Sequence, residues 1–396
     1  MSIAKTQPAF AWPLMNEHVN REDLDIMIRF LNTNPKLTQG QEVKRFEKAW
    51  SEWLGVENSV FVNSGSSANL ITLALLKEEF GTGEVIVSPL NWISDINSIQ
   101  LMGFKPVFAD IRLDTLGMDA NAILDQINSN TRAVLLTHIM GFNALERELI
   151  VELERRGIWL IEDVCESYGA TLDGRRIGSF GRLSNFSYYF GHHSTTIEGG
   201  MVCTRNAEDY DKLRMLRSHG MVREASSEEL KQSYASTYPD LHPEFIFGLP
   251  GFNVRSTEIQ AVLGQNQIKR LDREVVIRNK QYQIFLNALN KDKYFVDFRT
   301  EGMSNYGFVL MLRQANAKLY EAVTKALEAE GVEFRRGGSG GGNQLRQPYL
   351  KRTVGDVKPE AFKNVEHIHF NGFYFGNYPE IEADKIMSLC ERLNNA

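Results

Sequence analysis

Short apolar runs alternate with longer amphipathic segments along the first half of the chain. We expect strands at residues 60–62, 84–88, 106–109, 133–137 and 158–161, and one of the intervening helices at 144–155. Most of these runs are apolar at consecutive positions, which is typical of parallel strands that are buried on both faces. Strands and helices in alternation therefore predict an α/β fold with a mostly parallel central sheet.

Several of these runs end in a polar or aromatic residue. The residues at or just after the ends are Ser64, Trp92, Asp110, His138 and Asp163. In a mostly parallel sheet the carboxyl ends of the strands gather at one edge, and ligands bind there. The small-residue turn 63–67 also leads into a helix, whose free N–H groups suit a phosphate. We therefore predict a ligand site at this edge of the sheet.

The pattern of the chain changes near residue 290, where strands and helices indicate a smaller α+β unit. We predict a large domain at residues 1–262 and a small C-terminal domain at 263–396. Arg335 and Arg336 lead into a glycine-rich loop, 337–342, which we expect to face the substrate because binding residues concentrate on such loops.

The stretch 224–244 is polar and acidic, and we predict that it forms a surface excursion.

Charge and composition exclude several classes of protein. The formal net charge is −6, which argues against a nucleic-acid surface. The sequence contains no run of about 18 apolar residues, so we expect no membrane partner. Residues 1–12 lack the pattern of a secretory signal. Cys165, Cys203 and Cys390 are too far apart for a zinc or iron–sulfur motif, so we expect no metal and a reduced, cytoplasmic setting.

Two adjacent histidines, His192 and His193, stand in a polar turn between apolar runs at 186–188 and 201–203. No lysine occurs between Lys105 and Lys212, so the residues around this turn hold no amine that could form a Schiff base. A histidine can still move protons near neutral pH. The turn is therefore a candidate site of proton transfer.

Five motifs in order resemble the sugar-nucleotide aminotransferase family of pyridoxal-phosphate (PLP) enzymes of fold type I. They lie at 64–70, Trp92, 162–167, 187–200 and 251–255, and the resemblance extends from about residue 37 to 377. It implies the aspartate-aminotransferase-like fold, with a large domain and a small C-terminal α+β domain. Most of that family has a lysine where His192 stands, whereas a branch of sugar 3-dehydratases also has a His-His turn.

The resemblance implies a set of residues that hold PLP or its amine form, pyridoxamine phosphate. Asp163 would pair with the ring nitrogen and Trp92 would stack on the ring. Glu166 would face the hydroxyl group of the cofactor. The phosphate would be held by Gly65, Ser66 and Ser187.

The resemblance also implies partners of the site. Asn253 would reach the phosphate in a neighbouring subunit, so we expect a homodimer with active sites at its interface. His219 and Arg223 are candidates for binding the glutamate carboxylate or the substrate. His193 is expected to be structural.

For a member with His192, the resemblance implies dehydration of a nucleotide-linked 4-keto-6-deoxysugar, with GDP-4-keto-6-deoxymannose as the expected substrate and deoxysugar (O-antigen) biosynthesis as the setting. Glutamate would supply the amino group, His192 would move the proton, and ammonia would be released as the C3 hydroxyl is lost.

Three alternatives stay open. The chain could be a sugar aminotransferase that tolerates the loss of lysine, a PLP-fold binding protein without catalysis, or a protein in which His192 is an introduced substitution. The retained Asp163, Trp92, Ser187 and Glu166 favour catalysis, and the match of the whole turn favours a native histidine. An iron–sulfur-assisted relative is disfavoured because it needs a cysteine cluster.

Overall fold

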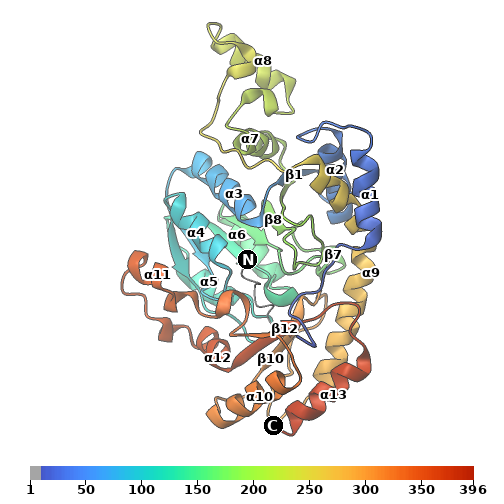
Figure 1. Cartoon of the computed structure of the whole chain (residues 1–396). Helices are drawn as coiled ribbons and strands as arrows, with labels where there is room; N and C mark the ends of the chain where they lie inside the picture. The colour runs from blue at the N-terminus through green and yellow to red at the C-terminus, as the bar shows by residue number, and fades with distance from the viewer. Residues whose placement is uncertain (1–9) are drawn as a thin grey trace, which may run out of the picture.

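The computed structural model describes residues 10–396 and builds the large part of the molecule around one seven-stranded sheet (Figure 1). In spatial order the strands are β1 (Asn58–Val62), β9 (Gly200–Thr204), β8 (Leu183–Ser187), β5 (Trp159–Asp163), β4 (Thr131–Thr137), β2 (Glu84–Val87) and β3 (Lys105–Phe108). Strand β9 runs against β1 and β8, and the other neighbouring pairs are parallel. The predicted α/β fold with a mostly parallel sheet is confirmed. Residues 1–9 lie outside the described part. They include most of residues 1–12, in which we expected no secretory signal.

Helices cover both faces of this sheet. Their bounds are α2 (Gln41–Leu54), α3 (Gly65–Phe80), α4 (Ile93–Leu101), α5 (Ala120–Gln126), α6 (Arg147–Arg155) and α7 (Ala207–Arg217). A further helix, α1 (Arg21–Leu31), packs against the long helix that spans residues 258–288. Val134 and Leu136 of β4 share a core with α2, α5 and α6, whereas Ala133 and Leu135 share a core with α3, α4 and α7. Successive positions of β4 are therefore buried on opposite faces, which explains its continuous apolar sequence.

A second unit of three antiparallel strands and four helices lies below the sheet in Figure 1. Its elements are β10 (Gly307–Met311), β12 (Gly372–Gly376), β11 (Phe334–Arg336), α10 (Ala317–Ala329), α11 (Pro348–Thr353), α12 (Lys363–Asn371) and α13 (Ala383–Asn394). A two-stranded hairpin, β6 (Thr171–Leu172) and β7 (Arg175–Arg176), stands apart from both sheets. The α+β pattern expected after residue 290 is confirmed.

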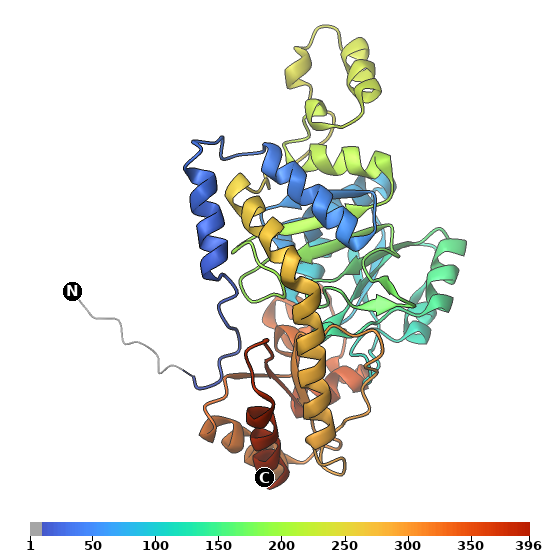
Figure 2. The same cartoon turned by 90° about the vertical axis from the view of Figure 1, so that its right-hand side faces the viewer.

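The long helix α9 (Glu258–Ala288) connects the two units (Figure 2). Its N-terminal part places Ala261 and Leu271 in the core of the large unit, and its C-terminal part places Tyr282 and Phe285 in the C-terminal core. The boundary predicted at residue 262 falls near the start of this helix and stays a prediction. Across residues 10–396, none of the helices combines the length and apolar content needed to cross a membrane.

The stretch 224–244 projects from the body of the molecule, as predicted, and is drawn at the top of Figure 1. It contains a helix that the sequence did not predict, α8 (Glu228–Thr237), in which no residue is buried. The helix begins at Ser227, whose side-chain oxygen accepts the N–H of Leu230. Leu230, Tyr234 and Ala235 are partly buried and pack against the core of the large unit. This contact and the Ser227 cap explain why the segment is helical.

The N-terminal segment is fixed to the C-terminal unit through Trp12. The Trp12 ring is 1% exposed and meets the rings of Phe308 and Phe375 edge-on, with centroids 5.8 and 5.7 Å apart. Its indole N–H donates to the Gly376 carbonyl at 2.8 Å. Trp12 therefore holds the residues that follow it against β12.

Replacement of Trp12 by alanine is expected to lower the free energy of unfolding by about 3–5 kcal/mol, because it empties a filled aromatic site. Urea unfolding of the two proteins measures the difference. The matched control is Phe10→Ala, since Phe10 is 46% exposed and its loss should change the free energy by less than about 0.5 kcal/mol. Equal effects of the two substitutions would show that Trp12 is no anchor.

Candidate active site

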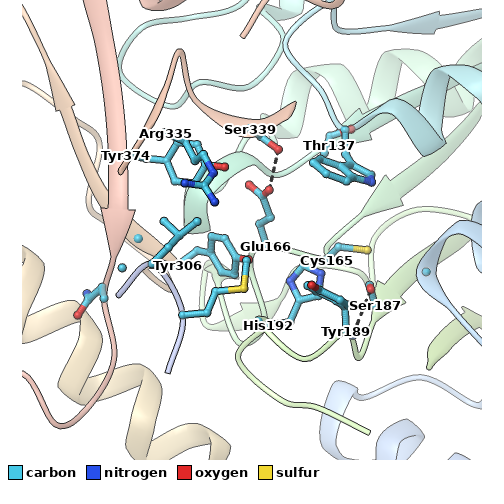
Figure 3. Close-up of a pocket in the computed structure, with 18 of the residues that line it drawn as sticks. Thr137, Cys165, Glu166, Ser187, Tyr189, His192, Tyr306, Arg335, Ser339 and Tyr374 are labelled. Carbon is cyan, nitrogen blue, oxygen red and sulfur yellow. Dashed lines mark hydrogen bonds between the residues drawn. The ribbon is translucent and has the colours of Figure 1, made fainter. Parts of the chain in front are cut away.

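A cavity of about 620 Å³ opens at the carboxyl edge of the central sheet, between the sheet and the C-terminal unit (Figure 3). Strands β1, β5 and β8 contribute residues at or just beyond their ends, namely Ser64, Asp163 and Ser187. Because these strands run in the same direction, their ends meet at one edge, where the sequence predicted a ligand site.

The cavity brings together most of the residues that the sequence singled out. The lining includes Gly65, Ser66, Trp92, Asp163, Glu166, Ser187 and His192. Trp92 keeps 56% of its side chain exposed although it precedes a buried helix. A large, open aromatic face beside buried polar groups is suited to a flat ligand.

The N-terminus of α3 lies directly against the end of β8. A Cβ atom on Gly65 would lie 2.4 Å from the Cβ of Ser187, so this contact requires glycine. Ser64 caps the helix by accepting the N–H of Ser67 at 3.0 Å. The first N–H groups of α3 and the Ser187 hydroxyl therefore border the same space, as a phosphate site requires.

Asp163 ends β5 and is 4% exposed. Its Oδ1 accepts the N–H of Cys165 at 2.9 Å, and its Oδ2 accepts an amide hydrogen of Asn69 at 3.2 Å. Both bonds hold the carboxyl group in one orientation at the floor of the cavity. A carboxylate so held can pair with a protonated ring nitrogen.

Glu166 connects the two units of the molecule. Its Oε1 accepts the hydroxyl hydrogen of Ser339 at 2.7 Å (Figure 3). Its Oε2 accepts the N–H of Met140 at 2.9 Å. Burial raises the pKa of Glu166 to about 7, although these hydrogen bonds oppose the shift. Ser339 belongs to the glycine-rich loop 337–342, and Ser339 and Gly341 both line the cavity.

His192 stands in the turn between β8 and β9, between the rings of Tyr189 and Tyr306, whose centroids lie 6.2 and 5.5 Å away. Burial lowers the pKa of His192 to about 4, and the negative charge of Asp163 only partly opposes this. The imidazole is therefore neutral at neutral pH. Its Nδ1 is buried and has no hydrogen-bond partner within residues 10–396, so no neighbouring group fixes the protonation of the ring.

His193 faces away from this chemistry. It is 2% exposed, and its Nε2 lies 3.0 Å from the Asn305 carbonyl oxygen and 3.3 Å from the Ser304 hydroxyl oxygen. Burial lowers its pKa well below the usual value. These contacts fit the structural role expected for His193.

Three predicted residues lie outside the cavity of this single chain. Asn253 is exposed, and its Oδ1 accepts from Nε of Arg255 at 3.0 Å. Arg223 pairs with Glu244 at 3.5 Å. The backbone N–H of His219 donates to the Phe252 carbonyl at 2.6 Å. Their predicted roles toward a ligand stay predictions.

The expectation that all five strand-end residues share one site is wrong for Asp110 and His138. Asp110 follows the edge strand β3 and accepts the N–H of Asn364 at 3.1 Å, at the start of α12. His138 accepts the Ala144 N–H at Nδ1, and its Nε2 lies 3.4 Å from Glu162. Both side chains satisfy buried backbone groups and leave the cavity lining to others.

The sequence analysis missed part of the lining. The N-terminal segment after Trp12, the α9 residue Arg278 and the residue before β10 contribute Leu14, Met15, Asn16, His18, Arg278 and Tyr306. No local pattern marks them, since they reach the cavity through the packing of the two units. Arg335 and Arg336, expected near the substrate, line the cavity.

The residues present fit pyridoxal phosphate. A fixed carboxylate, an open indole, a helix N-terminus and a serine hydroxyl border one cavity, and none of the lining residues within 10–396 is a lysine. Groups of three or more His, Cys, Asp or Glu that could hold a metal ion are absent from the described residues.

Comparisons with known proteins agree with this site. The model of the DegT/DnrJ/EryC1/StrS aminotransferase family matches residues 19–394. A GDP-4-keto-6-deoxy-D-mannose 3-dehydratase of Yersinia pseudotuberculosis is 31% identical to this chain over 385 residues, which are 96% of this chain and 97% of that protein.

Two solved structures also resemble this chain over almost its whole length. The E. coli GDP-4-keto-6-deoxy-D-mannose-3-dehydratase with bound hydrated PLP has a TM-score of 0.86 at 28% identity, covering 97% of this chain and 99% of that chain. A GDP-4-keto-6-deoxymannose-3-dehydratase with a trapped PLP-glutamate geminal diamine has a TM-score of 0.84 at 29% identity, covering 96% and 100%. The chain therefore belongs to the DegT/DnrJ/EryC1/StrS aminotransferase family.

Proposed function

We propose that this protein is a PLP- and glutamate-dependent 3-dehydratase that removes the C3 hydroxyl of a nucleotide-linked 4-keto-6-deoxysugar, with GDP-4-keto-6-deoxymannose as the expected substrate. The observation that carries the proposal is the neutral His192 in a cavity whose lining, among the residues that the structure describes, has no lysine. The relatives named as 3-dehydratases, at about 30% identity over nearly the whole chain, support the same reaction.

The residues of the chain divide the work of holding the cofactor. Asp163 would keep its ring nitrogen protonated, Trp92 would cover its ring, and Glu166 would face its hydroxyl. Gly65, Ser66 and Ser187 would hold its phosphate. When bound, the cofactor takes the amino group of glutamate and acts as an electron sink for the sugar.

His192 would move the proton. A neutral imidazole can accept a proton from the methylene carbon of the cofactor's amine form. The imidazolium can then donate this proton to the departing C3 hydroxyl of the sugar. Since no lysine lines the described part of the cavity, no side-chain amine there competes for the cofactor. The oxygen at C3 would therefore leave as water, and the nitrogen would leave as ammonia.

The balance of the reaction assigns glutamate a second role. Loss of oxygen from C3 is a two-electron reduction of the sugar, and conversion of glutamate to 2-oxoglutarate and ammonia supplies two electrons. No other reductant is needed.

The side of the cavity formed by the C-terminal unit suits a nucleoside diphosphate. Arg335 and Arg336 border it, and neither guanidinium is neutralised by a buried carboxylate. Arg335 pairs with Glu333 at 3.0 Å, in a half-exposed pair, and also donates to the Phe334 carbonyl at 3.2 Å. Two cations beside an open cavity favour an anionic ligand.

We also propose that the protein works as a homodimer. Trp92, Tyr189 and Ile197 are 56%, 43% and 51% exposed, although Trp92 and Tyr189 line the cavity. A second copy over this opening would cover these apolar side chains. It would also bring Asn253, Arg223 and His219 to the cavity that they do not reach within one chain.

All three cysteines are free thiols, which supports a reduced, cytoplasmic setting.

Incubation with PLP, glutamate and GDP-4-keto-6-deoxymannose should yield a sugar lighter by one oxygen, with one 2-oxoglutarate formed for each sugar converted. Mass spectrometry of the nucleotide sugar and an enzymatic assay of 2-oxoglutarate measure both products. An amino sugar would favour the aminotransferase reading. A lack of turnover with this and other nucleotide 4-ketosugars would favour a non-catalytic binding protein.

Substitution of His192 by asparagine should lower kcat by about 10²–10⁴-fold, because it removes the proton carrier, while the thermal midpoint and the affinity for PLP stay near those of the wild type. In His192→Lys the new lysine should form an imine with PLP. Reduction with borohydride should convert it to a stable amine, so that the mass of the chain increases by that of the bound cofactor. The substitution should also suppress dehydration. Full activity of either variant would show that His192 carries no proton.

Turnover should not fall through titration of His192 between about pH 8 and 6, because its pKa near 4 keeps it neutral there. Glu166 titrates in that range, since its pKa is about 7 and it gains a proton as the pH falls. An inflection of kcat/KM near pH 7 should therefore disappear in Glu166→Gln. An inflection near 6.5 that persists in this variant would mean that His192 is an ordinary, solvated histidine.

A further inference from the structure

A second buried carboxyl group lies behind Asp163. Asp95 stands on the first turn of α4, three residues after Trp92, and is 1% exposed. It does not line the cavity, and the side chains of Asp95 and Asp163 are within hydrogen-bonding reach of each other. The bonds around Asp95 include no arginine or lysine.

The hydrogen bonds around Asp95 are ordered by the network behind them. Asn185 donates to Oδ1 of Asn69 at 2.7 Å, so the Asn69 amide hydrogens must point toward the carboxyl groups. Asn69 Nδ2 donates to Oδ1 of Asp95 and to Oδ2 of Asp163. One amide group therefore donates to both carboxyl groups.

Thr137 fixes the other oxygen of Asp95. Asn91 donates to the Thr137 hydroxyl oxygen at 2.9 Å, so the single hydroxyl hydrogen is free for Oδ2 of Asp95, at 2.7 Å. Both oxygens of Asp95 thus accept from neutral donors. Neutral donors offset only part of the cost of burying a charge, and none of the donors to Asp95 within residues 10–396 is a cation.

Two buried carboxyl groups in contact cannot both be ionised without a large cost, so one of them holds a proton. Asp163 opens onto the cavity, where a cationic ring can compensate its charge, whereas Asp95 is enclosed. Burial and the adjacent Asp163 charge raise the pKa of Asp95 well above its usual value, in the direction that this geometry requires.

We propose that Asp95 is a positioning residue: it stays a neutral carboxylic acid and donates its proton to Asp163, which keeps Asp163 ionised and oriented toward the ring nitrogen of the cofactor. The part of this proposal that concerns the cofactor rests on the proposed function. A hydrogen bond donated to Asp163 stabilises its ionised form and makes it a weaker base. The proton of the ion pair is thereby kept on the ring.

The protonation state of Asp95 can be tested without any cofactor. In an infrared difference spectrum of the cofactor-free protein, wild type minus Asp95→Asn should show the C=O stretch of a protonated carboxylic acid. The matched control is Asp209→Asn, because Asp209 is also buried, at 2% exposed, but pairs with Arg182 at 2.8 Å. That difference should show carboxylate bands. Carboxylate bands for Asp95 would overturn the proposal.

The effect on Asp163 needs two variants and bound PLP. Asp95→Asn keeps a neutral donor and should bind PLP within about threefold of wild type, whereas Asp95→Ala should bind it about tenfold or more weakly, because a bond to a charged group is lost. The ¹⁵N shift of a labelled cofactor ring should move toward the unprotonated nitrogen in Asp95→Ala only.

Equal ring shifts in wild type and in a folded Asp95→Ala would overturn the positioning role. If Asp95→Ala does not fold, as judged by circular dichroism, a ring nitrogen that is unprotonated in wild type or in Asp95→Asn would do the same. A protein that binds PLP normally but does not dehydrate sugars would contradict the proposed function and leave this inference standing.

Discussion

The close approach of α3 to the end of β8 is the contact on which the site depends. Gly65 allows the first turn of the helix to reach Ser187, and the same edge receives Asp163 from β5. Strand β9 then runs back beside β8, so the connection between them must turn at the cavity. That turn carries His192. The direction of a few strands therefore decides which side chains can meet, before any chemistry is considered.

Burial gives the polar groups of the cavity different protonation states. It makes His192 a neutral base and raises the pKa of Glu166 to about 7, whereas Asp163 faces the space where a cation would bind. One low-dielectric environment thus reverses the usual order of the histidine and glutamate pKa values, and such shifts are how acid and base roles are assigned in enzymes. The loop that carries Ser339 borders the cavity from the C-terminal unit and donates a hydrogen bond to Glu166.

Much of this arrangement could be predicted from the sequence, because local patterns encode it. Consecutive apolar residues marked the strands, and the turn before α3 and the His-His turn marked two walls of the cavity. Asp110 and His138 do not line the cavity, because Asp110 accepts from the start of α12 and His138 from the N–H of Ala144. A strand end in the sequence does not reveal such partners. His18, Arg278 and Tyr306 were missed because they reach the cavity through packing between distant segments. Asp95 was missed because its partners lie on three other elements.

The central claim is that a histidine at this position makes the reaction an elimination rather than a transfer of nitrogen to the sugar. The most direct measurement follows the nitrogen atom: the protein is supplied with PLP, ¹⁵N-glutamate and GDP-4-keto-6-deoxymannose, and the label is traced by NMR. The account predicts that ¹⁵N appears as free ammonium, one for each sugar converted. Label that remains bonded to the sugar would contradict it.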